Sequence, residues 1–160
     1  MKIGLVSDSH GDRANLQKAI EQMGAVDIIF HMGDYTEDAA AIRHWVNIPV
    51  VSVKGNMDEF GPDGEMEVVT NVGDKKAMAC HGHCYHVKNE YNTLRYHAFE
   101  AGVDMVFFGH THIPMIDQSE ELLMINPGSC ALPHIGGKKT YGVVTIAEDG
   151  AVSAEICDLK

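Results

Sequence analysis

Ten histidines stand out among the 160 residues of this chain, and several lie beside aspartate, asparagine or glycine in short motifs. Histidine is the commonest metal ligand in proteins and a frequent general acid or base. The motifs are Asp8-Ser9-His10, Gly33-Asp34, Gly55-Asn56, His81-Gly82-His83 and Gly109-His110-Thr111-His112. In an Asp-x-His or His-x-His motif both ligands point the same way along an extended chain, because side chains alternate along a strand. The spacing therefore indicates ligands gathered for metal binding.

The combination of carboxylate and imidazole groups indicates which ions these motifs bind. Such a mixture suits Mn, Fe, Ni or Zn better than Ca, which prefers oxygen ligands alone. One tetrahedral zinc ion needs only three or four ligands. The motifs supply seven candidates, which are Asp8, His10, Asp34, Asn56, His81, His110 and His112. Seven ligands predict a dinuclear centre in which Asp34 bridges two divalent metal ions.

Each motif follows a segment whose apolar pattern predicts a β-strand. In the first half of the chain, short apolar runs alternate with segments of helical spacing. The predicted strands are 3–7, 26–32 and 50–53, and the predicted helices are 15–23 and 36–46. Thr36 is the predicted N-cap of the second helix. This strand–helix alternation favours a parallel sheet with right-handed crossovers.

The second half of the chain predicts more strands and only one helix. Segments 65–72 and 76–80 flank a Gly73-Asp74 turn and indicate a hairpin. The predicted helix is 89–101, and the remaining strands, mostly antiparallel, are 104–108, 113–117, 122–126, 141–147 and 151–158. The length is near the usual size of one domain. We therefore predict that residues 1–160 form one α/β domain, a four-layer α-β-β-α sandwich of two mixed sheets flanked by helices.

The predicted strands explain how distant motifs reach one place. In α/β sheets, ligands bind at the carboxyl ends of the strands. Five strand ends carry an aspartate, asparagine or histidine just after the apolar run, so we expect these side chains to meet in one polar site. His31 lies inside its predicted strand, before Gly33-Asp34, and we expect it to be buried and hydrogen-bonded.

Composition narrows the classes of partner and the compartment. The formal net charge is −11, and an acidic protein repels the phosphates of long nucleic acids. The first apolar run stops at Asp8, too soon for a signal-peptide core, and no apolar stretch is long enough to cross a membrane. The four cysteines have no Cys-x-x-Cys spacing, so we expect no disulfide framework. We therefore predict a cytoplasmic protein without a membrane partner.

The order Asp-x-His, Gly-Asp, Gly-Asn, His-Gly-His and Gly-His-Thr-His resembles that of the calcineurin-like metallophosphoesterase superfamily. It is most similar to the small single-domain phosphodiesterases of bacteria and archaea. The resemblance implies two sheets flanked by helices and hydrolysis of phosphate esters, usually with Mn, with Ni, Fe, Co, Zn and Mg as alternatives. It places Asp8, His10, Asp34 and His112 around a first ion, and Asp34, Asn56, His81 and His110 around a second.

The same resemblance implies a mechanism. Two divalent cations share a water and lower its pKa, and the bridging hydroxide attacks phosphorus in line. Asn56 can turn its amide N–H towards a phosphate oxygen, and His83 can orient a ligand or the phosphate. Many members carry a histidine directly after the Gly-Asn asparagine, where it protonates the leaving group. Met57 stands there in this chain and has no proton to give. Asp58, His83 and metal-bound water are the remaining candidates.

Three functions are compatible with these motifs. The leading hypothesis is a phosphodiesterase for a small phosphate ester, because the chain has no cap domain to enclose a small monoester. A phosphomonoesterase is the first alternative. The second is a non-catalytic scaffold, because the fold includes the retromer scaffold subunit, which has lost a ligand. All seven ligand positions are filled here, which disfavours the scaffold. Relatives are often dimers or larger, so we also expect a homo-oligomer.

Overall fold

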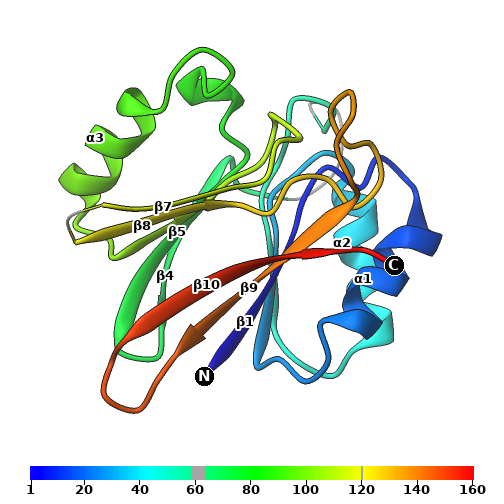
Figure 1. Cartoon of the computed structure of the whole chain (residues 1–160), viewed down its shortest axis with the longest axis horizontal. Helices are drawn as coiled ribbons and strands as arrows, with labels where there is room; N and C mark the ends of the chain where they lie inside the picture. The colour runs from blue at the N-terminus through cyan, green and yellow to red at the C-terminus, as the bar shows by residue number, and fades with distance from the viewer. Residues whose placement is uncertain (59–63, 120) are drawn as a thin grey trace.

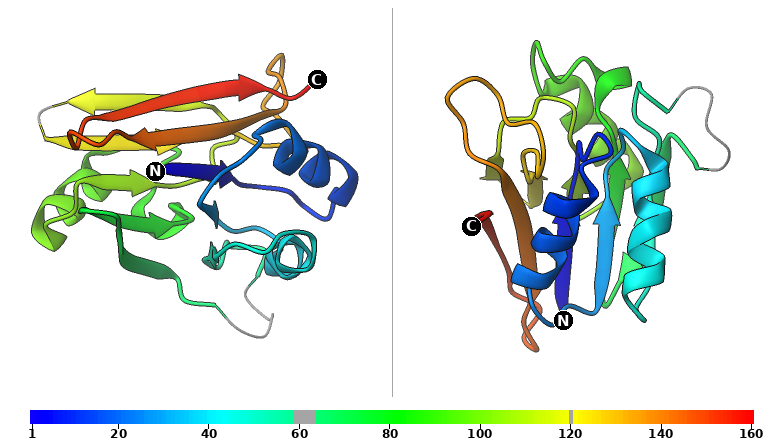
Figure 2. Two further views of the ribbon diagram at one scale, coloured as in Figure 1. Left: turned by 90° about the horizontal axis from the view of Figure 1, so that it is seen from below. Right: turned by 90° about the vertical axis from the view of Figure 1, so that its right-hand side faces the viewer.

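The computed structural model describes residues 1–58, 64–119 and 121–160. Two five-stranded sheets pack against each other, and helices lie on their outer faces (Figures 1 and 2). This is the predicted α-β-β-α sandwich of two mixed sheets. No helix in the described ranges is long and apolar enough to pass through a membrane.

The two ends of the chain meet in the first sheet. Its strands, in spatial order, are β10 (Val152–Asp158), β9 (Thr140–Ile146), β1 (Lys2–Val6), β2 (Ile28–His31) and β3 (Val50–Ser52). β1, β2 and β3 are parallel, whereas β9 is antiparallel to both β1 and β10. Helices α1 (Arg13–Gln22) and α2 (Thr36–Trp45) connect the parallel strands and lie beside this sheet (Figure 1). The predicted strand–helix alternation of the first half is confirmed.

The middle of the chain forms the second sheet. Its strands, in spatial order, are β4 (Glu67–Val72), β5 (Lys75–Cys80), β6 (Met105–Phe107), β8 (Leu122–Asn126) and β7 (Met115–Ser119). The predicted β4–β5 hairpin is confirmed. The later strands were predicted to be mostly antiparallel, and β7 is antiparallel to β8. β8 lies between β6 and β7 and is parallel to β6. Helix α3 (Asn92–Ala101) and the short 3-10 helix η1 (His83–Tyr85), which was not predicted, follow β5.

Three clusters of buried apolar side chains separate the layers. The largest lies between the two sheets, where the rings of Phe30 and Phe107 pack edge to face with centroids 5.0 Å apart. A second cluster packs Leu94 of α3 against the second sheet. A third packs Leu16 of α1 and Ile42 of α2 against the first sheet. Burial on both faces of each sheet holds the strand ends rigidly in relation to each other.

α1 begins two residues earlier than predicted, at Arg13, and α2 begins at the predicted residue but has a different N-cap. Thr36 is the first residue of α2 and not its N-cap, and the side chain of Tyr35 at the N-cap makes no capping hydrogen bond. The backbone N–H groups of Tyr35 and Thr36 donate instead to Asp58 Oδ1, each at 2.8 Å, from the loop after β3. α3 begins at Asn92, where the Glu90 carboxylate accepts first-turn N–H groups. Periodicity does not reveal a cap supplied by another loop, so the Thr36 prediction was wrong.

Candidate metal centre

The loops after β1, β2, β3, β5 and β6 meet at the carboxyl ends of these strands, along one edge of the sandwich (Figure 1). Contacts of 3.8 Å or less link into one cluster the side chains of Asp8, His10, Asp34, Asn56, His81, His110 and His112. The structure therefore brings together all seven residues that the sequence nominated as metal ligands.

One half of the cluster consists of Asp8, His10, Asp34 and His112. Each offers one ligand atom, and these atoms all lie within 4.8 Å of one another. His10 Nε2 lies 3.4 Å from Asp34 Oδ2 and 3.3 Å from His112 Nε2. His112 Nε2 in turn lies 3.2 Å from Asp8 Oδ1. Ligand atoms that share one ion at about 2.1 Å lie about 3.0–3.4 Å apart, so this half has the spacing of a metal site.

The other half gathers around His81. Its Nε2 lies 3.4 Å from Asp34 Oδ1, 3.1 Å from Asn56 Oδ1 and 3.2 Å from His110 Nδ1. Asp34 thus turns Oδ2 towards His10 in the first half and Oδ1 towards His81 in the second. A carboxylate between two groups of ligands can bind two cations, one through each oxygen atom.

The oxygen Oδ1 of Asp8 tests whether a cation fits here. Asp8 is fully buried, and among the described residues no hydrogen bond satisfies this oxygen. Burial by itself raises the pKa of Asp8, but the close approach of His112, His81 and Ser7 outweighs it and lowers that pKa. A buried carboxylate oxygen without a donor is costly unless a cation pairs with it. The donor set and this orphaned oxygen both fit a divalent metal ion.

The second ring nitrogens of two histidines show which tautomers they adopt. His81 Nδ1 lies 2.6 Å from the carbonyl oxygen of Met32, and His112 Nδ1 contacts the carbonyl oxygen of Leu132. A carbonyl oxygen can only accept, so each Nδ1 carries the hydrogen. Each Nε2 then turns a free lone pair towards the cluster, which is the arrangement by which proteins orient metal-binding histidines. Burial, followed by the nearness of His81, lowers the pKa of His110 to about 4, so its ring is neutral at pH 7.

A family model described as the calcineurin-like phosphoesterase superfamily domain matches residues 1–149. The chain belongs to this superfamily. A probable metallophosphoesterase of Bacillus subtilis is 36% identical over 94% of this chain and 88% of its own length. A phosphodiesterase of Methanocaldococcus jannaschii is 28% identical over 90% of this chain and 92% of its own. A solved structure from Streptococcus pneumoniae, described as a predicted phosphoesterase, has a TM-score of 0.79 at 28% identity and covers 98% of this chain and 97% of its own. The chain is thus a metallophosphoesterase, a hydrolase of phosphoric ester bonds.

Five of the seven candidate ligand residues in this phosphoesterase have left-handed backbone conformations. Their φ angles are 54° for Asp8, 46° for His10, 56° for Asp34, 68° for His110 and 58° for His112. Residues other than glycine rarely adopt such angles, which cost about 1 kcal/mol or more each. They persist only where surrounding contacts enforce them, and they concentrate at functional sites. No motif predicts this strain, because it depends on how the loops are held.

Three polar residues that the motifs did not nominate hold the loops around Asp8. Ser7 Oγ donates to Asp8 Oδ2 at 2.6 Å, and Ser129 Oγ donates to the carbonyl oxygen of Asp8 at 2.8 Å. Asn126 Nδ2 donates to the carbonyl oxygen of Gly109 at 2.8 Å. All three side chains are completely buried. The Asn126-Pro127-Gly128-Ser129 segment is a turn by composition, and its position between polar loops is visible only in the fold.

A buried hydrogen-bonded chain runs beneath the loop that carries His10. Gly33 donates its N–H to His31 Nδ1 at 3.3 Å, so His31 Nε2 carries the hydrogen and donates to Ser9 Oγ at 2.9 Å. Ser9 Oγ then donates to Asp38 Oδ2 at 2.7 Å. Burial lowers the pKa of His31, in keeping with this neutral ring. The prediction that His31 is a buried, hydrogen-bonded residue is confirmed.

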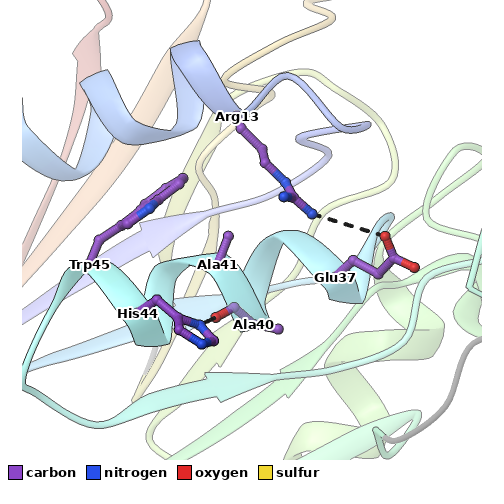
Figure 3. A pocket seen from close by; sticks show the side chains of 6 residues that line it. All are labelled: Arg13, Glu37, Ala40, Ala41, His44 and Trp45. Atoms are coloured by element: carbon purple, nitrogen blue, oxygen red, sulfur yellow. Dashed lines mark hydrogen bonds and ion pairs between the residues drawn. The ribbon is translucent and has the colours of Figure 1, made fainter.

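Asp38 is the far end of this chain and ties α2 to the His10 loop. Its Oδ2 also accepts the backbone N–H of Gly11 at 2.9 Å, and its Oδ1 lies 3.3 Å from Arg13 Nε. Arg13 lies 4.0 Å from Glu37 and lines a surface groove of about 440 Å³ between α1 and α2 (Figure 3). None of the groove's lining residues is a nominated metal ligand. Arg13 therefore lines the groove and also contacts the buried carboxylate of Asp38.

Replacement of Asp38 by asparagine is expected to weaken metal binding about 10- to 100-fold, the usual effect of losing a partner that orients a ligand loop. The amide N–H₂ group cannot accept from Ser9 and Gly11, so the His10 loop loses its anchor. The measurement is a Mn titration followed by calorimetry. Glu37→Gln is the matched control, because Glu37 is exposed and its carboxylate lies 4.0 Å from Arg13, away from Ser9 and Gly11. Equal Mn affinity in Asp38→Asn and the wild type would show that other contacts hold the loop.

Asp58 and His83, which with Asn56 were predicted to act beside the ions, have different surroundings. Asp58 is buried, and its carboxylate accepts backbone N–H groups on both oxygens, including that of Gly55 at 2.8 Å on Oδ2. These contacts make Asp58 a link between the loop after β3 and the start of α2. Met57 is 57% exposed, and its backbone N–H donates to Asp34 Oδ1 at 3.1 Å. His83 is half-buried, with its ring centroid 5.3 Å from His81 and 6.0 Å from His110.

Proposed function

We propose that this metallophosphoesterase is a phosphodiesterase with two divalent metal ions, which Asp34 bridges. The observation that supports this most directly is the Asp34 carboxylate, whose oxygens face His10 and His81 in two separate ligand groups. The first ion would be held by Asp8, His10, Asp34 and His112, and the second by Asp34, Asn56, His81 and His110. Mn is the proposed ion, because the mixed carboxylate and imidazole ligands suit it.

The protein residues prepare the site for an anionic substrate. When bound, two divalent ions would lower the pKa of a water to supply hydroxide and would offset the charge that develops on the phosphoryl oxygens. Asn56 turns its Oδ1 towards His81, which leaves its amide N–H groups to donate to a phosphate oxygen. Half-buried His83 lies beyond His81 and would orient the phosphate or deliver the leaving-group proton that Met57 cannot supply.

We propose a small phosphodiester as the substrate class. The acidic net charge of −11 works against long nucleic acids, whereas a local pair of cations would still attract a single phosphate group. A phosphomonoesterase remains the alternative for the same site. The filled ligand positions favour a catalyst over a scaffold. We further propose that the enzyme is cytoplasmic, because of its charge and cysteine content. We also propose that it forms a homo-oligomer, because members of this superfamily are often dimers or larger.

Two aryl esters test the substrate class. Rates on bis-p-nitrophenyl phosphate and p-nitrophenyl phosphate should be compared with Mn, Ni, Co and Mg. A higher kcat/KM for the diester supports the proposal, and a higher kcat/KM for the monoester supports the alternative. Absence of turnover on both at full metal loading would contradict a catalytic role.

Removal of the metal ions with EDTA is expected to abolish hydrolysis, and added Mn is expected to restore it. The stripped protein should also unfold at a lower temperature, because a bound cation pairs with the orphaned Asp8 Oδ1. Ligand at 100 times its Kd stabilises a folded protein by about 2.7 kcal/mol. Thermal unfolding at several Mn concentrations measures this effect. A melting temperature that does not respond to Mn would argue against binding at the cluster.

A further inference from the structure

A pocket of about 310 Å³ opens directly beside the candidate metal centre. It shares two residues with the site. Asn56 has its Oδ1 3.1 Å from His81 Nε2, and His83 has its ring centroid 5.3 Å from that of His81. The remaining lining residues are Lys54, Gly55, Gly64, Glu65 and Met66. A phosphoryl group held by the ligand cluster would therefore have this pocket next to it.

The pocket has the dimensions of a single ester arm. Pockets for small molecules typically enclose about 300–1,000 Å³, and this one is at the lower end of that range. It has room for an aryl or sugar-sized group and not for a polymer. Met66, which is 46% exposed, offers an apolar surface on one wall. The arm would pack there while its phosphate faces Asn56.

Lys54 contributes a positive charge to the pocket wall. Its side chain is half-buried, and in the described part of the chain its ammonium group makes no ion pair or hydrogen bond. In contrast, the ammonium groups of Lys138 and Lys139 contact Asp158 and Asp12. Water screens a half-buried charge less than an exposed one. Lys54 is therefore placed to attract an anion into the pocket.

Glu65 carries the opposite charge on the same pocket. Its carbonyl oxygen accepts the backbone N–H of Lys54 at 2.9 Å, which places the two residues side by side. The Glu65 side chain is exposed, so water screens its repulsion of an anion. The charge of half-buried Lys54 therefore dominates in the pocket. Removing the charge of Glu65 should have the opposite effect on anion binding to removing that of Lys54.

We propose that this pocket binds one ester arm of the phosphodiester substrate and that Lys54 selects an arm with its own negative charge. The arm would carry a carboxylate or a second phosphate. This proposal rests on the proposed phosphodiesterase function and narrows its substrate class.

Two diesters with the same leaving group isolate the arm. Phenyl p-nitrophenyl phosphate has a neutral arm, and 4-carboxyphenyl p-nitrophenyl phosphate has an anionic one. The wild type with Mn is expected to favour the anionic arm about fivefold in kcat/KM, mainly through KM, the effect of one partly screened ion pair. Release of p-nitrophenolate is the measurement for both diesters.

Four variants assign this preference to the pocket. Lys54→Gln should reduce the ratio between the two diesters to near one, and Lys54→Arg should retain it. Glu65→Gln should increase it, because a repulsive charge is removed. Lys18→Gln, on the exposed face of α1, makes the same charge change away from the pocket and should leave the ratio unaltered.

A binding measurement separates this proposal from the proposed function. Calorimetry of the Mn-loaded protein with 4-carboxyphenyl phosphate and phenyl phosphate should show tighter binding of the carboxylated compound in the wild type and not in Lys54→Gln. If neither diester is hydrolysed but this binding difference appears, the phosphodiesterase function fails and the pocket assignment stands. If Lys54→Gln discriminates between neutral and anionic arms as the wild type does, the pocket proposal is overturned.

Discussion

Replacement of Asp34 by asparagine is expected to reduce kcat on bis-p-nitrophenyl phosphate about 1,000-fold or more, which is about 4 kcal/mol in the activation barrier. The two carboxylate oxygens lie 3.4 Å from His10 Nε2 and 3.4 Å from His81 Nε2. Asparagine is neutral and would turn an N–H₂ group towards one of the two ligand groups, so it cannot bridge two cations. The kinetic measurement should use Mn concentrations that saturate the wild type.

Metal content shows whether bridging is the reason for this loss. Asp34→Asn should retain fewer ions per chain than the wild type when both are measured by elemental analysis after the same dialysis. Asp149→Asn is the matched control, because Asp149 is exposed in the turn between β9 and β10 and accepts a local hydrogen bond from the backbone N–H of Ala151. Full activity and unchanged metal content in Asp34→Asn would contradict its assignment as the bridge.

Gly109→Ala should combine a large loss of stability with a loss of activity. A Cβ atom at this position would lie 2.0 Å from Ser7 Oγ and 2.7 Å from Asp8 Oδ2. Both partners are buried, and they are joined by a 2.6 Å hydrogen bond. The methyl group must displace this pair, and we expect a cost of about 3 kcal/mol in the free energy of unfolding, at the upper end of overpacking effects. Urea unfolding of the metal-free protein measures it.

The activity of Gly109→Ala should fall about 100-fold or more, because the displaced Asp8 carries the orphaned oxygen of the first ligand group. Gly24→Ala is the control for the loss of a glycine. Its φ of 68° makes alanine unfavourable by about 1 kcal/mol, but among the described residues, apart from its chain neighbours, no atom lies within 4 Å of the added Cβ. It should therefore lose a little stability and no activity. Normal turnover by Gly109→Ala would show that this close packing does not position Asp8.

The strands and helices that position the site were predicted from the sequence, with small errors in where they begin and end. The apolar runs before Asp8, Asp34 and His110 are strands, as predicted, and each pairs in parallel with a neighbour. Such strands can be predicted because the hydrophobic pattern of a short segment indicates its secondary structure and burial. Errors arose where one segment depends on another. Thr36 has the side chain of an N-cap, yet Asp58 from a different loop supplies the cap of α2. The insertion of β8 between β6 and β7 was likewise invisible in local patterns.

Residue types and spacing indicated the candidate ligands, whereas the roles of neighbouring residues were not evident from them. Asp58 and Asp38 are both aspartates near motif residues, and only their contacts show that each accepts hydrogen bonds to position a ligand loop. Ser7, Asn126 and Ser129 are common polar residues without a distinctive spacing. Their importance comes from partners up to 121 positions away. A sequence motif spans only a few residues, so it cannot reveal hydrogen bonds between residues that are far apart in the chain.

By itself, the sequence identified a phosphoesterase fold and a set of candidate metal ligands. This was possible because the side-chain type determines what a residue can bind, and the apolar pattern of the preceding segment indicates a strand. The tertiary structure alone decided how the candidate ligands divide around Asp34, which histidine nitrogens face the cluster, and that five of these residues adopt left-handed backbone. It also placed Lys54 beside Asn56 and His83 in one pocket. These properties are set by contacts between loops far apart in the chain, which form only when both sheets are packed.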